Sequence, residues 1–396
     1  MPPGDEPIPL ARPHVGAREE ELVIEALRSH RLSLGPRLPE FEGMLGARLG
    51  ARHVSAVSSG TAALHLSVRA AGVDAGDEVV TTPFSFVASA NCLLYENARP
   101  VFCDIDPRTL NIDPRAAAAA VGERTTGLLP VHIFGYPADM PALEELAAAR
   151  ALWIVEDACE ALGALHADGT QVGARGNLAA FGFYPNKQLT TGEGGAVVSP
   201  AAELKGRIDS ERNQGRAADM GWLDHDRLGY NYRLSDLACA LGLAQLERLD
   251  EMLEARARIA RLYSLALAGI EGLELPCADA GGDRRSWFVY VVQLPADVDR
   301  DGAIHALRGG GVDSKPYLPA IHLSPFYRER FGHRDGEFPV CEEVARRSLA
   351  LPCFPELPDL EGERVVTAVR EVVATIRPTG LPSGPREVLD QGDAAR

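Results

Sequence analysis

Short apolar runs alternate with longer helix-like segments over the first half of the chain. The apolar runs cover residues 54–57, 78–81, 101–104, 127–131, 152–156, 179–183 and 196–199. The segments at 61–71, 86–95, 113–121 and 139–149 are rich in Ala and Leu, and several begin with Ser, Thr, Asp or Pro, as helices do. Strands that alternate with helices predict an α/β fold with a mostly parallel sheet, and functional side chains are expected where its strands end.

The pattern changes after Gly215. Leu234, Leu237, Leu241, Leu249 and Leu253 are spaced three, four or eight positions apart, which predicts one long helix with an apolar stripe. Further on, residues 287–294 predict a strand, and residues 301–308 and 340–349 predict helices. We therefore expect a large domain at 1–250 that includes an N-terminal arm, a small α/β domain at 251–377 and a flexible tail at 378–396.

Composition and charge exclude several function classes. The chain has 396 residues, of which 46% are hydrophobic and 24% charged, as in a folded globular protein. Its net charge of −16 disfavours binding to nucleic acid or to an anionic membrane surface. No apolar run reaches the roughly 20 residues that span a bilayer, and the proline-rich, acidic start does not resemble a secretory signal, so a cytoplasmic protein is expected.

The cysteines predict neither disulfides nor a metal site. The chain contains seven of them, an odd number, and they are scattered with no CxxC pair. A disulfide framework or a zinc site would place cysteines in paired, regular spacings.

Three motifs carry candidate chemistry. Gly60 and Thr61 follow the first apolar run and open a helix, so their N–H groups are suited to bind a phosphate, although the same residues also suit an ordinary helix cap. Asp157 ends another apolar run, where it is placed either to pair with a cationic ring nitrogen or to cap the next turn. Lys187 lies between an apolar run and a glycine-rich loop, where it is either a Schiff-base nucleophile or a solvated lysine. Taken together, they occur in the chain order of a pyridoxal phosphate site.

Longer segments make the resemblance specific. The chain resembles the DegT/DnrJ/StrS family of sugar aminotransferases from about residue 8 to residue 376. The segments that carry the resemblance are Ser-Ser-Gly-Thr-Ala-Ala-Leu-His-Leu at 58–66, Gly-Asp-Glu-Val-Val at 76–80, Phe-Ser-Phe-Val-Ala-Ser-Ala-Asn at 84–91, Pro-Val-Phe-Cys-Asp-Ile-Asp-Pro at 100–107, Glu-Asp-Ala-Cys-Glu-Ala-Leu-Gly-Ala at 156–164, the Lys187 segment at 183–195, and Gly-Tyr-Asn-Tyr-Arg-Leu-Ser-Asp at 229–236.

The resemblance implies a fold, a reaction and an assembly. The fold is that of aspartate aminotransferase (fold type I), and the cofactor is pyridoxal 5'-phosphate. The reaction moves an amino group, usually from glutamate, onto a keto sugar carried by a nucleotide. The implied assembly is a homodimer with active sites at the subunit interface.

Individual roles follow by position in the family's motifs. Lys187 resembles the residue that forms the Schiff base and then moves the proton, and Asp157 resembles the acid that pairs with the ring nitrogen. Phe86 matches the aromatic side chain that stacks on the ring, and residues 60–61 match the phosphate loop. Asn231 resembles a residue that reaches the cofactor phosphate of the partner subunit.

Other positions depart from the family or extend its site to the substrate. Gly182 stands where many relatives have a phosphate-binding Ser, so another group must replace that hydroxyl. Glu160 stands where Gln or His often lies near the cofactor 3-hydroxyl, as in some relatives that aminate carbon 4 of a sugar. Tyr317 and His322 fall in a segment that resembles the family's substrate side, although a His among apolar residues is more often structural.

Two alternative functions remain open. The substrate could be a keto cyclitol, which the same motifs would serve. A non-catalytic sensor on the same fold is the other alternative, but it has no chemical need for Lys187, Asp157 and the glycine loop together. Sugar dehydration is disfavoured because the dehydrating relatives replace the lysine with His.

Overall fold

The computed structural model describes residues 6–217 and 224–376. Its main feature is a seven-stranded sheet in the order β1-β7-β6-β5-β4-β2-β3. The strands are β1 (His53–Val57), β2 (Glu78–Thr81), β3 (Arg99–Phe102), β4 (Thr125–Leu129), β5 (Trp153–Asp157), β6 (Leu178–Gly182) and β7 (Gly195–Ser199). Each coincides or overlaps with one of the apolar runs of the sequence.

The sheet is mostly parallel, so the predicted fold class is confirmed. Strands β3, β2, β4, β5 and β6 pair in parallel, whereas β7 runs antiparallel to both β6 and β1. Both faces are buried: along β6, Ala180 packs in the hydrophobic cluster of Leu64, and Phe181 packs in that of Phe41. Burial on two sides explains why these strands have continuous apolar runs.

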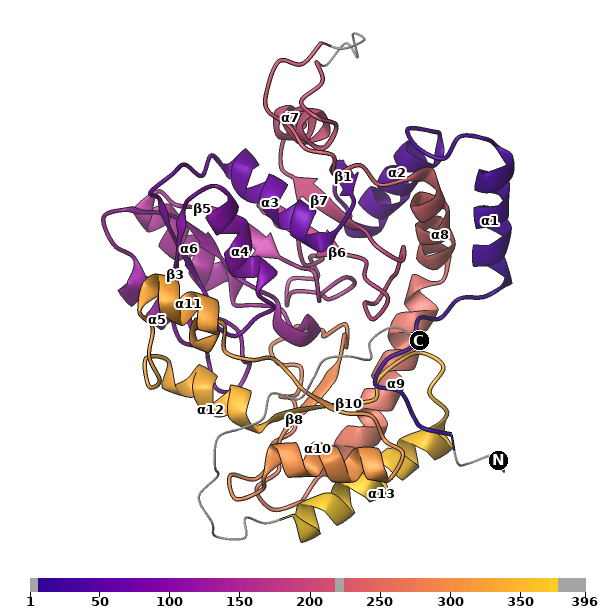
Figure 1. Ribbon diagram of the computed structural model, residues 1–396, viewed down its shortest axis with the longest axis vertical. Helices are drawn as coiled ribbons and strands as arrows, with labels where there is room; N and C mark the ends of the chain where they lie inside the picture. Colours follow the sequence, from indigo (N-terminus) through magenta and orange to yellow (C-terminus); the bar gives the residue numbers. More distant parts are fainter. Residues whose placement is uncertain (1–5, 218–223, 377–396) are drawn as a thin grey trace.

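Helices cover both faces of this sheet (Figure 1). Helix α3 (Gly60–Ala71) packs on β5, β6 and β7, and helix α2 (Arg37–Leu49) packs on β1. The remaining helices of this part are α1 (Ala17–Arg28), α4 (Ala88–Tyr95), α5 (Pro114–Ala120), the short η1 (Ile133–Gly135), α6 (Met140–Arg150) and α7 (Ala202–Arg212). Helices α1, α2 and α7 were not predicted from the sequence.

The leucine-rich segment is two helices, so the prediction of one long helix is wrong. Helix α8 (Asp236–Glu247) and helix α9 (Leu249–Leu267) are separated at Arg248, whose φ of −117° and ψ of 10° interrupt the helix. Leu234 lies before α8. Helix α1 packs beside α8, and α9 continues towards a second, smaller sheet (Figure 1).

That second sheet has three strands in the order β8-β10-β9. They are β8 (Tyr290–Gln293), β9 (Lys315–Pro316) and β10 (Ser348–Leu351), and the helices around them are α10 (Arg300–Gly309), η2 (Ile321–Leu323), α11 (Pro325–Phe331), α12 (Pro339–Arg347) and α13 (Asp359–Thr375). The predicted helix at 340–349 runs too far, because Ser348 and Leu349 pair with β8.

This smaller part has its own core. Residues of α9, β8, β10 and α13 share one hydrophobic cluster, and the two-domain division stays a prediction. Ile8, expected in the large domain, packs in this second core, and its backbone bonds to Gly311 and Asp313. The predicted tail at 378–396 lies outside the described residues. Within the described ranges, no helix is both long and apolar enough to cross a membrane.

Candidate active site

One cavity gathers most of the residues that the sequence singled out. It has a volume of about 510 Å³ and lies where β5 and β6 end and α3 begins. Its lining includes Gly60, Thr61, Phe86, Asp157, Glu160, Gly182, Lys187 and Tyr317. The parallel strands explain this convergence, because their carboxyl ends meet at one edge of the sheet.

Helix α3 supplies a place for an anion at one end of the cavity. The Ser59 side chain caps the helix by accepting a hydrogen bond from the N–H of Ala62, 3.0 Å away. The N–H groups of Gly60 and Thr61 bond to no other described residue and point along the positive end of the helix dipole. This geometry suits a phosphate group.

Three small residues pack tightly beside that helix start. A Cβ atom on Gly60 would lie 3.1 Å from Cys159 Sγ and 3.2 Å from Gly182 Cα, so a larger residue at position 60 would push these neighbours aside. A Cβ atom on Gly182 would lie 3.4 Å from Cys159 Sγ, which is an ordinary contact distance. Burial raises the pKa of the Cys159 thiol, so it stays neutral beside the anion site.

Asp157 has a fixed orientation. It is almost fully buried, and its Oδ2 accepts a hydrogen bond of 2.6 Å from Ser89 Oγ at the start of α4. Its Oδ1 accepts from the N–H of Cys159 at 3.1 Å. The two bonds fix the carboxyl group of Asp157, which can pair with a protonated ring nitrogen.

Lys187 lies in the loop between β6 and β7. Its Nζ lies 3.6 Å from Glu160 Oε1 and 4.0 Å from the centre of the Phe288 ring. The chain has two other lysines, and neither lines the cavity: Lys205 pairs with Asp209, and Lys315 is exposed on β9. Lys187 is therefore the candidate nucleophile of this site.

Glu160 is a buried carboxylate opposite that lysine. Burial raises its pKa, although the nearby Lys187 ammonium opposes the shift. Its Oε2 accepts a hydrogen bond of 2.9 Å from the N–H of Phe134. A raised pKa favours the protonated carboxyl group, which is the form that a group beside a phenolic oxygen would have to adopt.

Two aromatic side chains line other parts of the cavity. Phe86 is 61% exposed, which leaves its ring free to stack on a ligand. Tyr317 contacts the rings of Phe134 and Phe288. Burial and the neighbouring Glu160 raise the Tyr317 pKa, so the phenol stays protonated and can donate a hydrogen bond.

Asn231 lies outside this cavity. It is exposed, and its backbone pairs with that of Asn213. Its predicted role is in the site of a second subunit, which stays a prediction.

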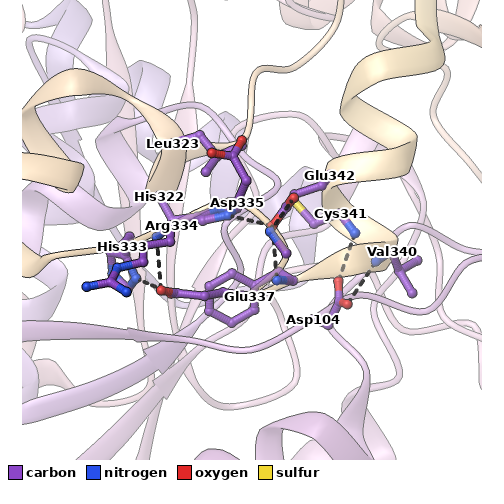
Figure 2. Close-up of polar contacts among 12 residues, drawn as sticks. Asp104, His322, Leu323, His333, Arg334, Asp335, Glu337, Val340, Cys341 and Glu342 are labelled. Atoms are coloured by element: carbon purple, nitrogen blue, oxygen red, sulfur yellow. Dashed lines mark hydrogen bonds and ion pairs between the residues drawn. The ribbon is translucent and has the colours of Figure 1, made fainter.

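His322 also lies outside the lining of this cavity, and its predicted place at the sugar site stays a prediction. It is fully buried, and its Nε2 bonds to Glu342 Oε1 at 3.1 Å (Figure 2). Its ring packs against Phe338. The same region holds Asp104, at the end of β3, whose carboxylate accepts from the first N–H groups of α12 (Figure 2). These contacts hold the imidazole of His322 in place within its own segment.

Several functional positions were missed by sequence reasoning. Ser89 and Cys159 lay inside quoted motifs, but nothing local indicated that they face Asp157 or the anion site. Phe288 and Asn186 reach the Lys187 neighbourhood from a distant segment and from the loop itself. For Phe288 the chain gave no signal, because the contact spans about a hundred positions.

Comparison with known proteins agrees with this geometry. The sequence profile of the DegT/DnrJ/EryC1/StrS aminotransferase family matches residues 13–370. Spore coat polysaccharide biosynthesis protein SpsC of Bacillus subtilis is 38% identical, over 92% of this chain and 97% of its own. GDP-perosamine synthase of Caulobacter vibrioides is 33% identical, over 92% and 98%.

Solved structures give the same result. The S. venezuelae protein DesV, crystallised with a ketimine intermediate, superposes with a TM-score of 0.86 at 36% identity, over 91% of this chain and 95% of that one. The aminotransferase TlmJ from Streptoalloteichus hindustanus gives a TM-score of 0.87 at 34% identity, over 93% and 99%. The chain belongs to the DegT/DnrJ/EryC1/StrS aminotransferase family.

Proposed function

We propose that this protein is a pyridoxal phosphate-dependent aminotransferase that transfers an amino group from glutamate to a nucleotide-linked keto sugar. The observation that carries the proposal is the shared cavity of Lys187, Asp157 and the start of α3. These are a nucleophile, an acid for a ring nitrogen and an anion site, which together match the three ends of pyridoxal phosphate.

The residues present fit this cofactor. The N–H groups of Gly60 and Thr61, which bond to no other described residue, would hold the phosphate. Asp157 would bind the ring nitrogen, Phe86 would cover the ring, and Glu160 would lie near the 3-hydroxyl. When bound, the cofactor supplies an electron sink for the carbon that loses its proton.

The protein's own side chains then carry the remaining work. Lys187 is the one basic side chain among the described lining residues, so it is the group that attaches the cofactor and moves a proton at Nζ. Asp157 is held by Ser89 and would keep the ring nitrogen of the bound cofactor protonated. Tyr317 is placed to donate a hydrogen bond on the substrate side.

The relatives support the substrate class. GDP-perosamine synthase is named for a nucleotide-linked amino sugar, and SpsC for polysaccharide biosynthesis. Because these proteins match almost the full length of the chain, we assign a keto sugar on a nucleotide as the acceptor. A keto cyclitol is the alternative acceptor, and a non-catalytic sensor is not favoured.

We further propose a homodimer. Phe86 and Tyr184, both at the cavity, are 61% and 53% exposed, and Asn231 is exposed on a neighbouring segment. Aromatic side chains left open to water at a ligand site favour cover by a second copy of the chain.

The compartment that we propose is the cytoplasm. All seven cysteines are free thiols, and Cys159 and Cys277 are the two that are not fully buried. Unpaired thiols are typical of proteins kept in a reducing compartment.

A turnover screen tests the function. Purified protein is incubated with a panel of nucleotide-linked keto sugars and keto cyclitols, with glutamate or glutamine as donor, and the products are identified by mass spectrometry. The Lys187→Ala variant is the control. We expect an amino sugar nucleotide and a keto acid in equal amounts with the unchanged protein. Product from cyclitols alone, or equal turnover by Lys187→Ala, would contradict the proposal.

A further inference from the structure

Arg256 of α9 is a buried arginine that donates to four backbone carbonyl groups. The side chain is 2% exposed. Its Nη1 donates to the carbonyls of Phe288 at 3.1 Å and Cys353 at 2.9 Å, and its Nη2 donates to those of Asn186 at 3.4 Å and Lys187 at 3.1 Å. One guanidinium thus joins α9 to the Lys187 loop, to the chain before β8 and to the chain after β10.

The charge of Arg256 has no carboxylate partner among the residues described at 6–217 and 224–376. No ion pair forms with it, and its Nε has no hydrogen-bond partner. Burying an ion without a counter-ion costs several kcal/mol, and an apolar side chain would fill the same core without that cost. The hydrogen bonds to these backbone carbonyls therefore explain why an arginine occupies this buried position.

Two of those carbonyls belong to the loop of the nucleophile. Residues 186 and 187 lie in neither a helix nor a strand, so no regular ladder bonds their carbonyl groups. Arg256 is the one described group that donates to them. Without it, the backbone that carries the Lys187 side chain would lose these two bonds.

The third carbonyl belongs to Phe288, whose ring contacts Lys187. The Phe288 ring lies 4.0 Å from Lys187 Nζ, and the carbonyl of Phe288 is held by the same guanidinium. Arg256 therefore fixes both the backbone that carries the ammonium group and the ring that supports it. Its forked nitrogens can reach both segments at once, which a single-nitrogen side chain cannot do.

We propose that Arg256 is a positioning residue that sets where Lys187 Nζ enters the cavity. The proposal rests on the proposed function, in which Lys187 attaches pyridoxal phosphate. In this role Arg256 contacts neither cofactor nor substrate. Replacing Arg256 should therefore slow the covalent attachment of the cofactor more than it weakens the binding of the cofactor in the cavity.

The test separates attachment from binding. Cofactor-free samples of the unchanged protein, Arg256→Met and Arg256→Lys are mixed with pyridoxal phosphate, and the covalent link is followed by absorbance and trapped with borohydride. Binding of pyridoxamine phosphate, which forms no bond to lysine, is measured in parallel. Arg347→Met is the control, because Arg347 also donates to backbone carbonyls, those of Leu294 and Gly272, away from the cavity.

We expect attachment in Arg256→Met to be about 10- to 100-fold slower, as for a nucleophile displaced by about 1 Å. Pyridoxamine phosphate should bind nearly as well as to the unchanged protein. The attachment rate of Arg256→Lys should lie between those of the unchanged protein and Arg256→Met. Arg347→Met should attach the cofactor at the normal rate.

Several outcomes would overturn the proposal. One is a folded Arg256→Met with a normal attachment rate. Another is a loss of pyridoxamine phosphate binding as large as the loss in attachment rate. If Arg256→Met does not fold, a normal rate in Arg256→Lys decides against it, and unfolding of both variants would assign Arg256 to the fold alone. Failure of the unchanged protein to attach the cofactor at Lys187 would instead contradict the proposed function.

Discussion

Lys187 Nζ and Glu160 Oε1 lie 3.6 Å apart at the centre of the candidate active site. The pair joins the single basic side chain among the described lining residues to a carboxyl group whose pKa is raised by burial. The neighbouring Glu156 is also fully buried but has the opposite behaviour. Burial opposes its ionisation, yet hydrogen bonds from His132 and Asn177 prevail and lower its pKa.

This contrast predicts opposite effects of two conservative substitutions on stability. In cofactor-free protein at pH 7, Glu160→Gln should raise the free energy of unfolding by up to about 1 kcal/mol, because the amide avoids a buried charge. Glu156→Gln should lower it by roughly 1 to 3 kcal/mol, because an amide cannot accept all the bonds that the carboxylate receives. Denaturant unfolding measures both.

The pH dependence follows from the sign of each shift. Ionised Glu156 stabilises the fold above its unfolded pKa of about 4.3, and that contribution is lost as the pH falls through its lower folded pKa. For Glu160, whose folded pKa is raised, the contribution is present below about pH 4.3 and is lost as the pH rises through the folded pKa. Both mutational effects should therefore shrink in acid. If Glu160→Gln and Glu156→Gln changed the free energy of unfolding in the same direction at pH 7, the opposite pKa shifts of the two carboxyl groups would be contradicted.

Asp157→Asn should lower transamination by orders of magnitude with a modest loss of cofactor. The amide keeps the shape of the side chain but not the charge that holds a ring nitrogen protonated. Turnover and bound cofactor are measured on the same samples. Asp104→Asn is the matched control, because Asp104 also follows a strand but caps α12 outside the cavity. Near-normal turnover by Asp157→Asn would show that the ring nitrogen has another partner.

The packing at the anion site predicts different outcomes for two glycines. Gly182→Ser should retain or strengthen cofactor binding, because its Cβ would lie 3.4 Å from Cys159 Sγ and 3.6 Å from Gly60 Cα, and its hydroxyl adds a donor. Gly60→Ala should weaken binding by about tenfold or more, because its Cβ would lie 3.1 Å from Cys159 Sγ. Equilibrium titration with pyridoxal phosphate compares the two. The reverse order of affinities would contradict the placement of the phosphate.

Much of the sheet and the candidate residues Asp157 and Lys187 could be predicted because their sequence signals are local. A continuous apolar run indicates a strand buried on both faces, and Asp157 and Lys187 stand beside such runs. The break at Arg248 and the start of β10 at Ser348 depend on packing and strand pairing that a periodic pattern does not show. Arg256 had no signal either, since an arginine in an amphipathic helix normally faces water.

His322 shows the same limit within the site. A histidine near Tyr317 in the sequence was expected to share its cavity, but the chain turns and buries the imidazole against Glu342 and Phe338. Glu342 belongs to α12 and Phe338 directly precedes that helix, and the sequence alone does not bring either residue next to His322.

Shared sites in a homodimer predict recovery of activity by subunit exchange. Lys187→Ala and Asn231→Ala subunits should each be inactive alone, and mixing them should yield heterodimers with one doubly defective site and one intact site. Activity is measured before and after exchange, with each variant mixed with itself as the control. Full activity of Asn231→Ala, or no recovery after exchange confirmed by mass spectrometry, would contradict a role for Asn231 in its neighbour's site.

Borohydride reduction of the protein as purified with pyridoxal phosphate tests the central claim most directly. The chain has three lysines, so a peptide digest assigns the attachment point without ambiguity. We predict a yellow protein whose reduced cofactor is found on the peptide that contains Lys187 and is absent from Lys187→Ala. Cofactor fixed to Lys205 or Lys315, or no covalent cofactor at all, would contradict the account.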